Sequence, residues 1–235
     1  MTALIASVVA LFGGAQASDV GTYVPTGLRD ATFIAEIVSG NQAELRKIND
    51  DFGKSYRYKT STVSLKDPLM FRIDSKVEDT NIAYIVNGTT QWFKLGGAHI
   101  KVDLSKSPGK RQTAFDVGLL TSSLFDSLFD AKFVSMDAEN GAAIFDVNFK
   151  QRDIDPSHHR IWIDKEKKFV VKREWYSRTG ALRATFTYSE PVQVSGFWFP
   201  TRMEVRNADN VLAGVTIYKE IKANPGLPDS LFAAQ

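Results

Sequence analysis

The chain has 235 residues, of which 43% are hydrophobic and 11% aromatic, enough for the core of one large domain and too many for a disordered chain. Its 29 basic and 27 acidic residues leave a formal charge of +2, which argues against a nucleic-acid-binding protein because such proteins concentrate basic charge. The absence of cysteine excludes disulfides, thiolate metal sites and a cysteine nucleophile.

The first residues have the pattern of a secretory signal. An apolar run at residues 3–12 leads into Ala-Gln-Ala at residues 15–17, a small-x-small pattern typical of a cleavage site. The run is too short to anchor the chain across a bilayer. It departs from the usual signal pattern in one respect, because no Lys or Arg precedes it. We therefore expect residues 1–17 to be a signal peptide and residues 18–235 to form one mature domain in the periplasm. A buried N-terminal helix is the alternative.

Helical spacing predicts that the region after a short lead-in is α-helical. In DATFIAEIVSGNQAELRKINDDFG, residues 30–53, apolar side chains recur on one face, with Asp30 or Thr32 as the N-cap and a Ser-Gly-Asn break at residues 39–41. The first helix would bury Phe33, Ile34, Ile37 and Val38, and the second would bury Leu45, Ile48 and Phe52.

Most of the remaining chain has the pattern of β-strands. In residues 160–190 large side chains alternate between two faces, and polar turns are expected at residues 164–168 and 178–180. Asn87-Gly88 and Gly96-Gly97 are two further strong turn signals. The chain then has about ten or eleven strands, mostly antiparallel because the turns between them are short.

One segment, residues 112–131, interrupts the strands. Gly118 and the polar run at residues 121–123 would divide it into two short helices. Its apolar residues at helical spacing are Phe115, Leu119, Leu120, Leu124, Leu128 and Phe129. Helices inside a long antiparallel meander predict an α+β fold, with a large sheet curled into an open half β-barrel and a helical lid over its mouth. The apolar inner surface is then either a cavity for an apolar ligand or an ordinary sheet–helix core.

The strongest candidate for a metal site is DIDPSHHR, with Asp153, Asp155, His158 and His159. Adjacent side chains on a strand point to opposite faces, so the two histidines would not share an ion, and Asp-x-Asp-Pro-Ser is ordinary turn chemistry. The sequence has no nucleophile elbow, H-E-x-x-H motif or phosphate-cradling glycine loop. A carboxylate pair acting on glycosides stays open, because spacing in sequence does not give spacing in space. We expect no enzymatic activity, no metal and no cofactor.

Three short motifs occur in an order found in one protein family. Pro68 and Phe71 open a strand in KDPLMFRIDSK, Asn87-Gly88 and Trp92 follow in IVNGTTQWFKLGG, and LPDSLF comes later. In this order the motifs resemble those of the LolA-like proteins, the periplasmic carriers of outer-membrane lipoproteins, over roughly residues 30–235. The resemblance implies an unclosed β-barrel with a helical lid and a hydrophobic cavity that holds acyl chains.

The resemblance also suggests which residues bind the ligand. The cavity wall would include Phe71, Trp92, Trp175 and Trp198, and the lid would present Phe115, Leu119 and Leu120. Core packing alone is the alternative for each of them. In the family an arginine before the proline bonds to the lid and keeps it shut when empty, but Asp67 stands at that position here. The resemblance therefore leaves open whether the cargo is a lipoprotein or another lipid.

The expected function is that of a monomeric carrier that moves lipid or lipoprotein acyl chains toward the outer membrane. The resemblance implies an inner-membrane transporter and an outer-membrane acceptor as partners, with only transient membrane contact. The alternative is an envelope-stress sensor or scaffold domain that binds lipid or a protein partner without transport. The basic residues between Lys165 and Arg173 would suit anionic headgroups, or else form a solvated hairpin edge.

Overall fold

The computed structural model describes residues 19–77 and 79–233. The predicted signal peptide, residues 1–17, lies outside the described residues. Among the helices that the structure describes, none is both long enough and apolar enough to cross a membrane.

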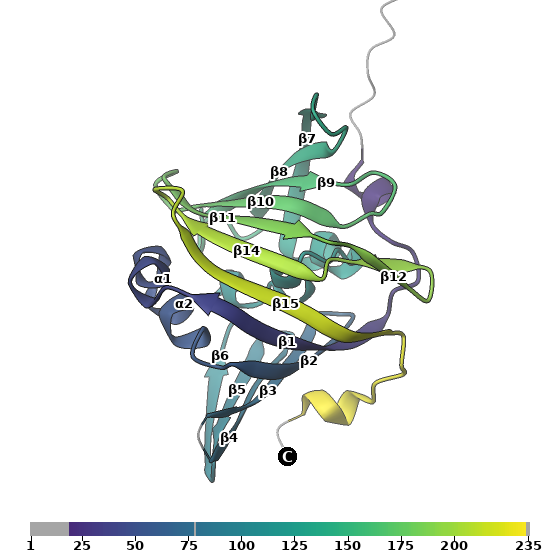
Figure 1. Cartoon of the computed structure of the whole chain (residues 1–235). Helices are drawn as coiled ribbons and strands as arrows, with labels where there is room; N and C mark the ends of the chain where they lie inside the picture. Colours follow the sequence, from purple (N-terminus) through teal and green to yellow (C-terminus); the bar gives the residue numbers. More distant parts are fainter. Residues whose placement is uncertain (1–18, 78, 234–235) are drawn as a thin grey trace, which may run out of the picture.

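Fifteen strands and two short α-helices make up most of the described chain (Figure 1). The strands are β1 (Asp30–Gly40), β2 (Thr60–Lys66), β3 (Met70–Val77), β4 (Thr80–Asn87), β5 (Thr90–Leu95), β6 (Ala98–Asp103), β7 (Phe129–Met136), β8 (Ala143–Phe149), β9 (His158–Ile163), β10 (Val170–Tyr176), β11 (Leu182–Ser189), β12 (Val192–Val194), β13 (Phe197–Phe199), β14 (Arg202–Asn207) and β15 (Leu212–Ala223). The α-helices are α1 (Gln42–Ile48) and α2 (Asp50–Ser55). Short turns of other helix types are η1 (Val20–Tyr23), η2 (Pro108–Lys110), η3 (Thr113–Val117), η4 (Leu124–Leu128) and η5 (Asp229–Phe232).

Thirteen strands form one antiparallel sheet in the order β6-β5-β4-β3-β2-β1-β15-β14-β11-β10-β9-β8-β7, and β12 pairs with β13 separately. The first and last strands, β1 and β15, are neighbours in the middle of this order, as Figure 1 shows for the dark blue and yellow arrows. The predicted fold, an open antiparallel half-barrel with a lid, is confirmed. The number of strands is larger than the expected ten or eleven.

The predicted helix at the start of residues 30–53 is wrong, because this segment is the central strand β1. Phe33 lies opposite Val63 of β2 and Ile34 lies opposite Lys219 of β15, so β1 is paired along both edges. Several residues of β1 are Thr, Ile or Val, whose branched side chains favour strands. The helical pattern was therefore ambiguous, and pairing on both sides decided the outcome.

The second predicted helical segment is confirmed as α1 and α2. Asn41 caps α1 by accepting hydrogen bonds from the backbone N–H groups of Ala43 and Glu44, at 3.1 and 3.3 Å. Asn49 caps α2 by accepting from the N–H of Phe52 at 2.8 Å. These side chains satisfy backbone donors that the first helical turn leaves without partners.

Residues 104–128, here called the lid, join the two edge strands of the main sheet, β6 and β7. Within residues 112–128 the lid contains the two short helices η3 and η4, as predicted. The predicted helix end at residue 131 is wrong, because Phe129 already pairs with Phe149 in the sheet. Gly118 follows η3 with a φ of +80°, a left-handed conformation that favours glycine.

Candidate functional site

An apolar surface runs along the inner face of the sheet, the face that packs against the lid, out to the edge strand β6. One row of side chains, here called the inner row, crosses five adjacent strands in register and consists of Val63, Ile73, Tyr84, Phe93 and Ile100. Directly paired residues of antiparallel strands share a face, so Ile100 continues the face on which Val63 belongs to the main core. Exposure rises from 3% at Val63 to 54% at Ile100.

Two neighbouring side chains widen the exposed end of the inner row. Leu95 is 45% exposed and Val102 is 38% exposed, and the strand register places both on the same face as Ile100. Contiguous exposed apolar side chains mark candidate surfaces for ligands or partners when they form a large enough patch. This end of the inner face is therefore the candidate functional site.

The lid packs against the inner face of the sheet mainly over strands β7 to β11, and η3 also contacts β3. The Phe115 ring centre lies 5.0 Å from that of Phe129 and 5.3 Å from that of His159. The backbone N–H of Val170 donates to the carbonyl oxygen of Gly118 at 2.9 Å. The lid thus covers this part of the inner face and leaves the β6 end of the inner row exposed.

The cavity found between the lid and the sheet is small. A cavity of about 10 Å³, room for no more than one water molecule, lies among side chains of both. Its walls are Phe33, Val117, Leu119, Phe199, Pro200, Tyr218 and Ile221. Because no acyl chain fits in this volume, a ligand can enter this part of the interior only if the lid moves.

A charged pair lies where the lid meets the sheet. Arg173 of β10 is 3% exposed and donates from Nη1 to Oδ1 of Asp116 on the lid at 3.0 Å. Its guanidinium carbon lies 4.9 Å from the ring centre of Phe115 and 4.1 Å from that of Phe186. Within the described residues, Nε of Arg173 has no hydrogen-bond partner. The sheet therefore holds a buried cation whose carboxylate partner comes from the lid.

This environment shifts the pKa values of three groups. Enclosure by neighbouring side chains raises the pKa of Asp116 although Arg173 opposes the shift, and that side chain is still 50% exposed. Burial, together with the charge of Arg173, lowers the pKa of His159 well below 6.5. Burial raises the pKa of Tyr84, and the charges of Asp116 and Asp51 add to that shift. His159 is thus neutral at neutral pH.

A side-chain contact holds the lid to the turn between β2 and β3. The hydroxyl of Ser123 on the lid donates a hydrogen bond to the carboxylate of Asp67. A second hydrogen bond joins the lid to the turn between β4 and β5, because Nε of Arg111 donates to the carbonyl oxygen of Gly88 at 3.0 Å. The motif resemblance around Pro68 places Asp67 where the LolA-like carriers would have the lid-bonding arginine. The contact between this position and the lid is therefore present here, with a carboxylate acceptor in place of an arginine donor.

Six of the seven residues predicted to bind the ligand lie in or against the main core; they are Phe71, Phe115, Leu119, Leu120, Trp175 and Trp198. Trp92 lies apart from them, in a second cluster with Ile85 and Phe232. Alternate residues of β5 point to opposite faces, so Phe93 faces inward and Trp92 faces outward. The structure thus brings six residues together and excludes Trp92 from the group, while a ligand-binding role stays a prediction for all seven.

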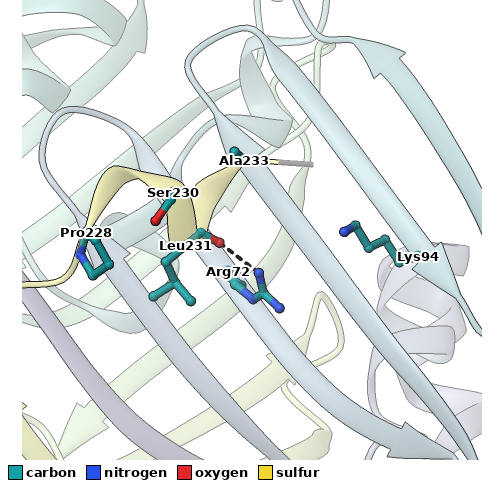
Figure 2. Close-up of a pocket in the computed structure, with 6 residues that line it drawn as sticks. All are labelled: Arg72, Lys94, Pro228, Ser230, Leu231 and Ala233. Atoms are coloured by element: carbon teal, nitrogen blue, oxygen red, sulfur yellow. Dashed lines mark hydrogen bonds between the residues drawn. The ribbon is translucent and has the colours of Figure 1, made fainter. Parts of the chain in front are cut away.

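A larger cavity, of about 370 Å³, lies on the outer face of the sheet beside the C-terminal turn η5, and Figure 2 shows the residues that line it. It is lined by Arg72, Lys94, Pro228, Ser230, Leu231 and Ala233. Arg72 donates to the carbonyl oxygen of Leu231 at 2.8 Å and forms two hydrogen bonds with Asp74. Lys66 donates to the carbonyl oxygen of Leu227 at 2.7 Å. These contacts anchor the C-terminal segment, on the face opposite to the inner row.

The two histidines of DIDPSHHR point to opposite sides of β9, as predicted. His158 stacks on Tyr176 with ring centres 4.8 Å apart, whereas His159 is 1% exposed beside Phe115. In the part of the chain that the structure describes, no group of three or more His, Asp or Glu side chains is placed to hold a metal ion.

The sequence interpretation missed both the inner row and the Arg173–Asp116 pair. One signal for the row was available, because Ile100 and Val102 alternate with polar residues in HIKVDL and so mark a strand with one apolar face. The charged pair gave no such signal, since 57 positions separate its members.

Comparisons with known proteins add a partial sequence match and several structural ones. A family model described only as an uncharacterized protein matches residues 120–235. No curated protein gives a significant sequence match.

Three solved structures resemble this chain over most of its length. A LolA superfamily protein from Nitrosomonas europaea has a TM-score of 0.62 and 16% identity, covering 92% of this chain and 94% of its own. A DUF1329 family protein from Desulfovibrio piger has a TM-score of 0.55 and 13% identity, covering 91% and 92%. An outer membrane lipoprotein-sorting protein domain from Vibrio parahaemolyticus has a TM-score of 0.55 and 14% identity, covering 91% and 92%. The chain therefore has the fold of the LolA superfamily, as the motifs around Pro68 and Trp92 predicted.

Proposed function

We propose that this protein is a periplasmic carrier that binds the acyl chains of a lipid or lipoprotein and moves them toward the outer membrane. The observation that carries the proposal is the inner row, an unbroken line of apolar side chains from the core at Val63 to the exposed Ile100. The description of one structural relative as a lipoprotein-sorting domain supports the same class of ligand.

The inner row suits an extended hydrocarbon chain. From β2 to β6 it crosses four inter-strand spacings, about 19 Å in all. Each methylene group moved from water onto such a surface contributes about 0.8 kcal/mol, and no directional bond is required. Because apolar contact involves no directional bonds, no such bonds have to be broken when the ligand is transferred to a partner.

Replacing Ile100 with glutamate is expected to weaken acyl-chain binding about tenfold or more, since burying an isoleucine side chain contributes roughly 1.5–3 kcal/mol and 1.4 kcal/mol corresponds to a factor of ten. Ile100 is exposed, so the variant should fold as the wild type does. Displacement of a fluorescent fatty acid measures the affinity.

The matched control is Val211→Glu, which changes an apolar side chain of similar exposure, 42%, outside the inner face. Equal affinities of the two variants for the fatty acid would show that the inner row is not part of the binding site. Failure of the wild type to bind any acyl compound would reject the carrier proposal and favour a scaffold that binds a protein partner.

Loading of the closed interior requires the lid to open, and Asp67 is the residue expected to limit opening. Replacing Asp67 with alanine removes a hydrogen bond to a charged group, worth roughly 1.5–3 kcal/mol. We expect amide hydrogen exchange in the lid to become about tenfold faster, because local opening becomes easier.

The control for this experiment is Asp146→Ala, which removes a carboxylate that accepts from Arg160 at 2.7 Å on the outer face. Its effect should stay near β8 and β9 and leave the lid unchanged. If lid exchange in the Asp67 variant matches the wild type, the contact with Ser123 does not hold the lid.

A further inference from the structure

We propose that Arg173 binds the anionic headgroup of an amphiphile whose apolar tail lies along the inner row, and that Asp116 of the lid occupies this place in the closed state. The inference rests on the proposed acyl-chain binding and adds the chemical class of the ligand, an apolar chain ending in a carboxylate or phosphate.

The first step of the argument is the cost of a buried cation. Arg173 lies between the rings of Phe115 and Phe186, and a guanidinium in apolar surroundings destabilises the fold unless an anion pairs with it. Its anion, Asp116, belongs to the lid and not to the sheet. When the lid moves away, Arg173 is left without a carboxylate, so another anion gains a full charge-assisted interaction by taking its place.

The second step is access. Asp116 is 50% exposed, so the pair lies at the border between the core and solvent, where a ligand can compete for the arginine. Nε of Arg173 is buried and has no partner among the described residues, which leaves a donor for a second oxygen of an incoming headgroup.

The third step places the tail. Asp116 belongs to η3, and η3 contacts β3, the strand that carries Ile73 of the inner row. A headgroup that replaces Asp116 therefore lies close to the row, and a chain attached to it can follow Tyr84 and Phe93 to the exposed Ile100. The positive charge of Arg173 thus lies next to an apolar surface, which matches the charged head and apolar tail of an anionic amphiphile.

The test compares ligands that share a tail and differ in the head. Binding of hexadecanoic acid, hexadecyl phosphate and hexadecanol is measured by isothermal titration at pH 8, for the wild type and for the variants Arg173→Met and Asp116→Asn. We expect the wild type to bind the two anions about tenfold more tightly than the alcohol. Arg173→Met should lose this preference and still bind the alcohol, whereas Asp116→Asn should strengthen binding of the anions because the competing carboxylate is gone.

The structure offers a matched control pair on the other face of the sheet. Arg160 and Asp146 form an ion pair at 2.7 Å away from the inner row, so Arg160→Met and Asp146→Asn make the same changes in charge there. Both controls should retain the wild-type preference. Loss of preference in the controls would mean that net charge, and not Arg173, attracts the anions.

Other outcomes separate this inference from the proposed function. Equal affinity of the wild type for acid and alcohol overturns the headgroup site and leaves acyl binding intact, whereas no binding of any tailed compound rejects both. Inorganic phosphate or acetate that binds as tightly as the tailed anions would make Arg173 a site for free anions and overturn the proposal. If Arg173→Met does not fold by circular dichroism, Asp116→Asn decides, and unchanged anion preference in that variant overturns the proposal.

Discussion

Replacing Gly118 with alanine is expected to destabilise the protein by roughly 2–5 kcal/mol, from a left-handed backbone and from overpacking of the core. Gly118 has a φ of +80°, a conformation that an L side chain rarely adopts. A Cβ atom at this position would lie 2.7 Å from Cδ1 and 2.9 Å from Cγ of Tyr188. The Tyr188 ring is buried and cannot swing away, so either the lid or β11 must shift.

Gly141→Ala separates the two causes. Gly141 also has a positive φ, +70°, but a Cβ atom there would meet nothing within 4 Å. Its substitution should cost about 1–2 kcal/mol from the backbone alone. Urea unfolding of the wild type and both variants gives the comparison. Equal losses at the two positions would show that the lid does not lie tightly on Tyr188.

The local parts of this fold could be predicted from the sequence. Turns at Asn87-Gly88 and at residues 164–168 follow from residues that favour such bends, and the structure places a strand connection at each. Residues 42–55 form two helices that asparagine side chains cap, and such capping depends on neighbouring residues alone.

The parts that depend on distant pairing could not be predicted. β1 has an ambiguous local pattern and becomes a strand because β2 and β15 pair with its two edges. Trp92 was expected in the cavity wall because it belongs to a motif, but the register of β5 turns it outward and turns Phe93 inward. The Arg173–Asp116 pair depends on how the lid lies on β10, which no short window of sequence contains.

His159→Leu is expected to stabilise the protein increasingly as the pH falls below 6.5. His159 is 1% exposed, and within the described chain neither of its ring nitrogens has a hydrogen-bond partner. Removing such buried polar atoms should add roughly 1–3 kcal/mol of stability even at pH 7.5. The rings of Phe115, Phe129 and Phe149 surround the imidazole, and leucine suits that apolar site.

The pH dependence follows from the direction of the pKa shift. In the unfolded chain the imidazole has a pKa near 6.5, whereas in the folded protein burial and the charge of Arg173 lower it well below that value. Between the two values only the unfolded chain takes up the proton, so acid favours unfolding by up to about 1.4 kcal/mol per pH unit. Above pH 6.5 the imidazole is neutral in both states, and this contribution to the slope vanishes.

Urea unfolding at a series of pH values from 4.5 to 8 measures this difference. The carboxylates of the protein titrate in the same acid range in the wild type and the variant, so their contribution cancels when the two curves are subtracted. His158→Leu is the matched control, because it removes the neighbouring histidine that stacks on Tyr176 on the outer face, and any effect common to both variants is subtracted. Parallel curves of unfolding free energy against pH for the wild type and His159→Leu would mean that the imidazole contacts a polar partner or solvent in the folded state. The lid would then pack more loosely around His159 than the ring distances indicate.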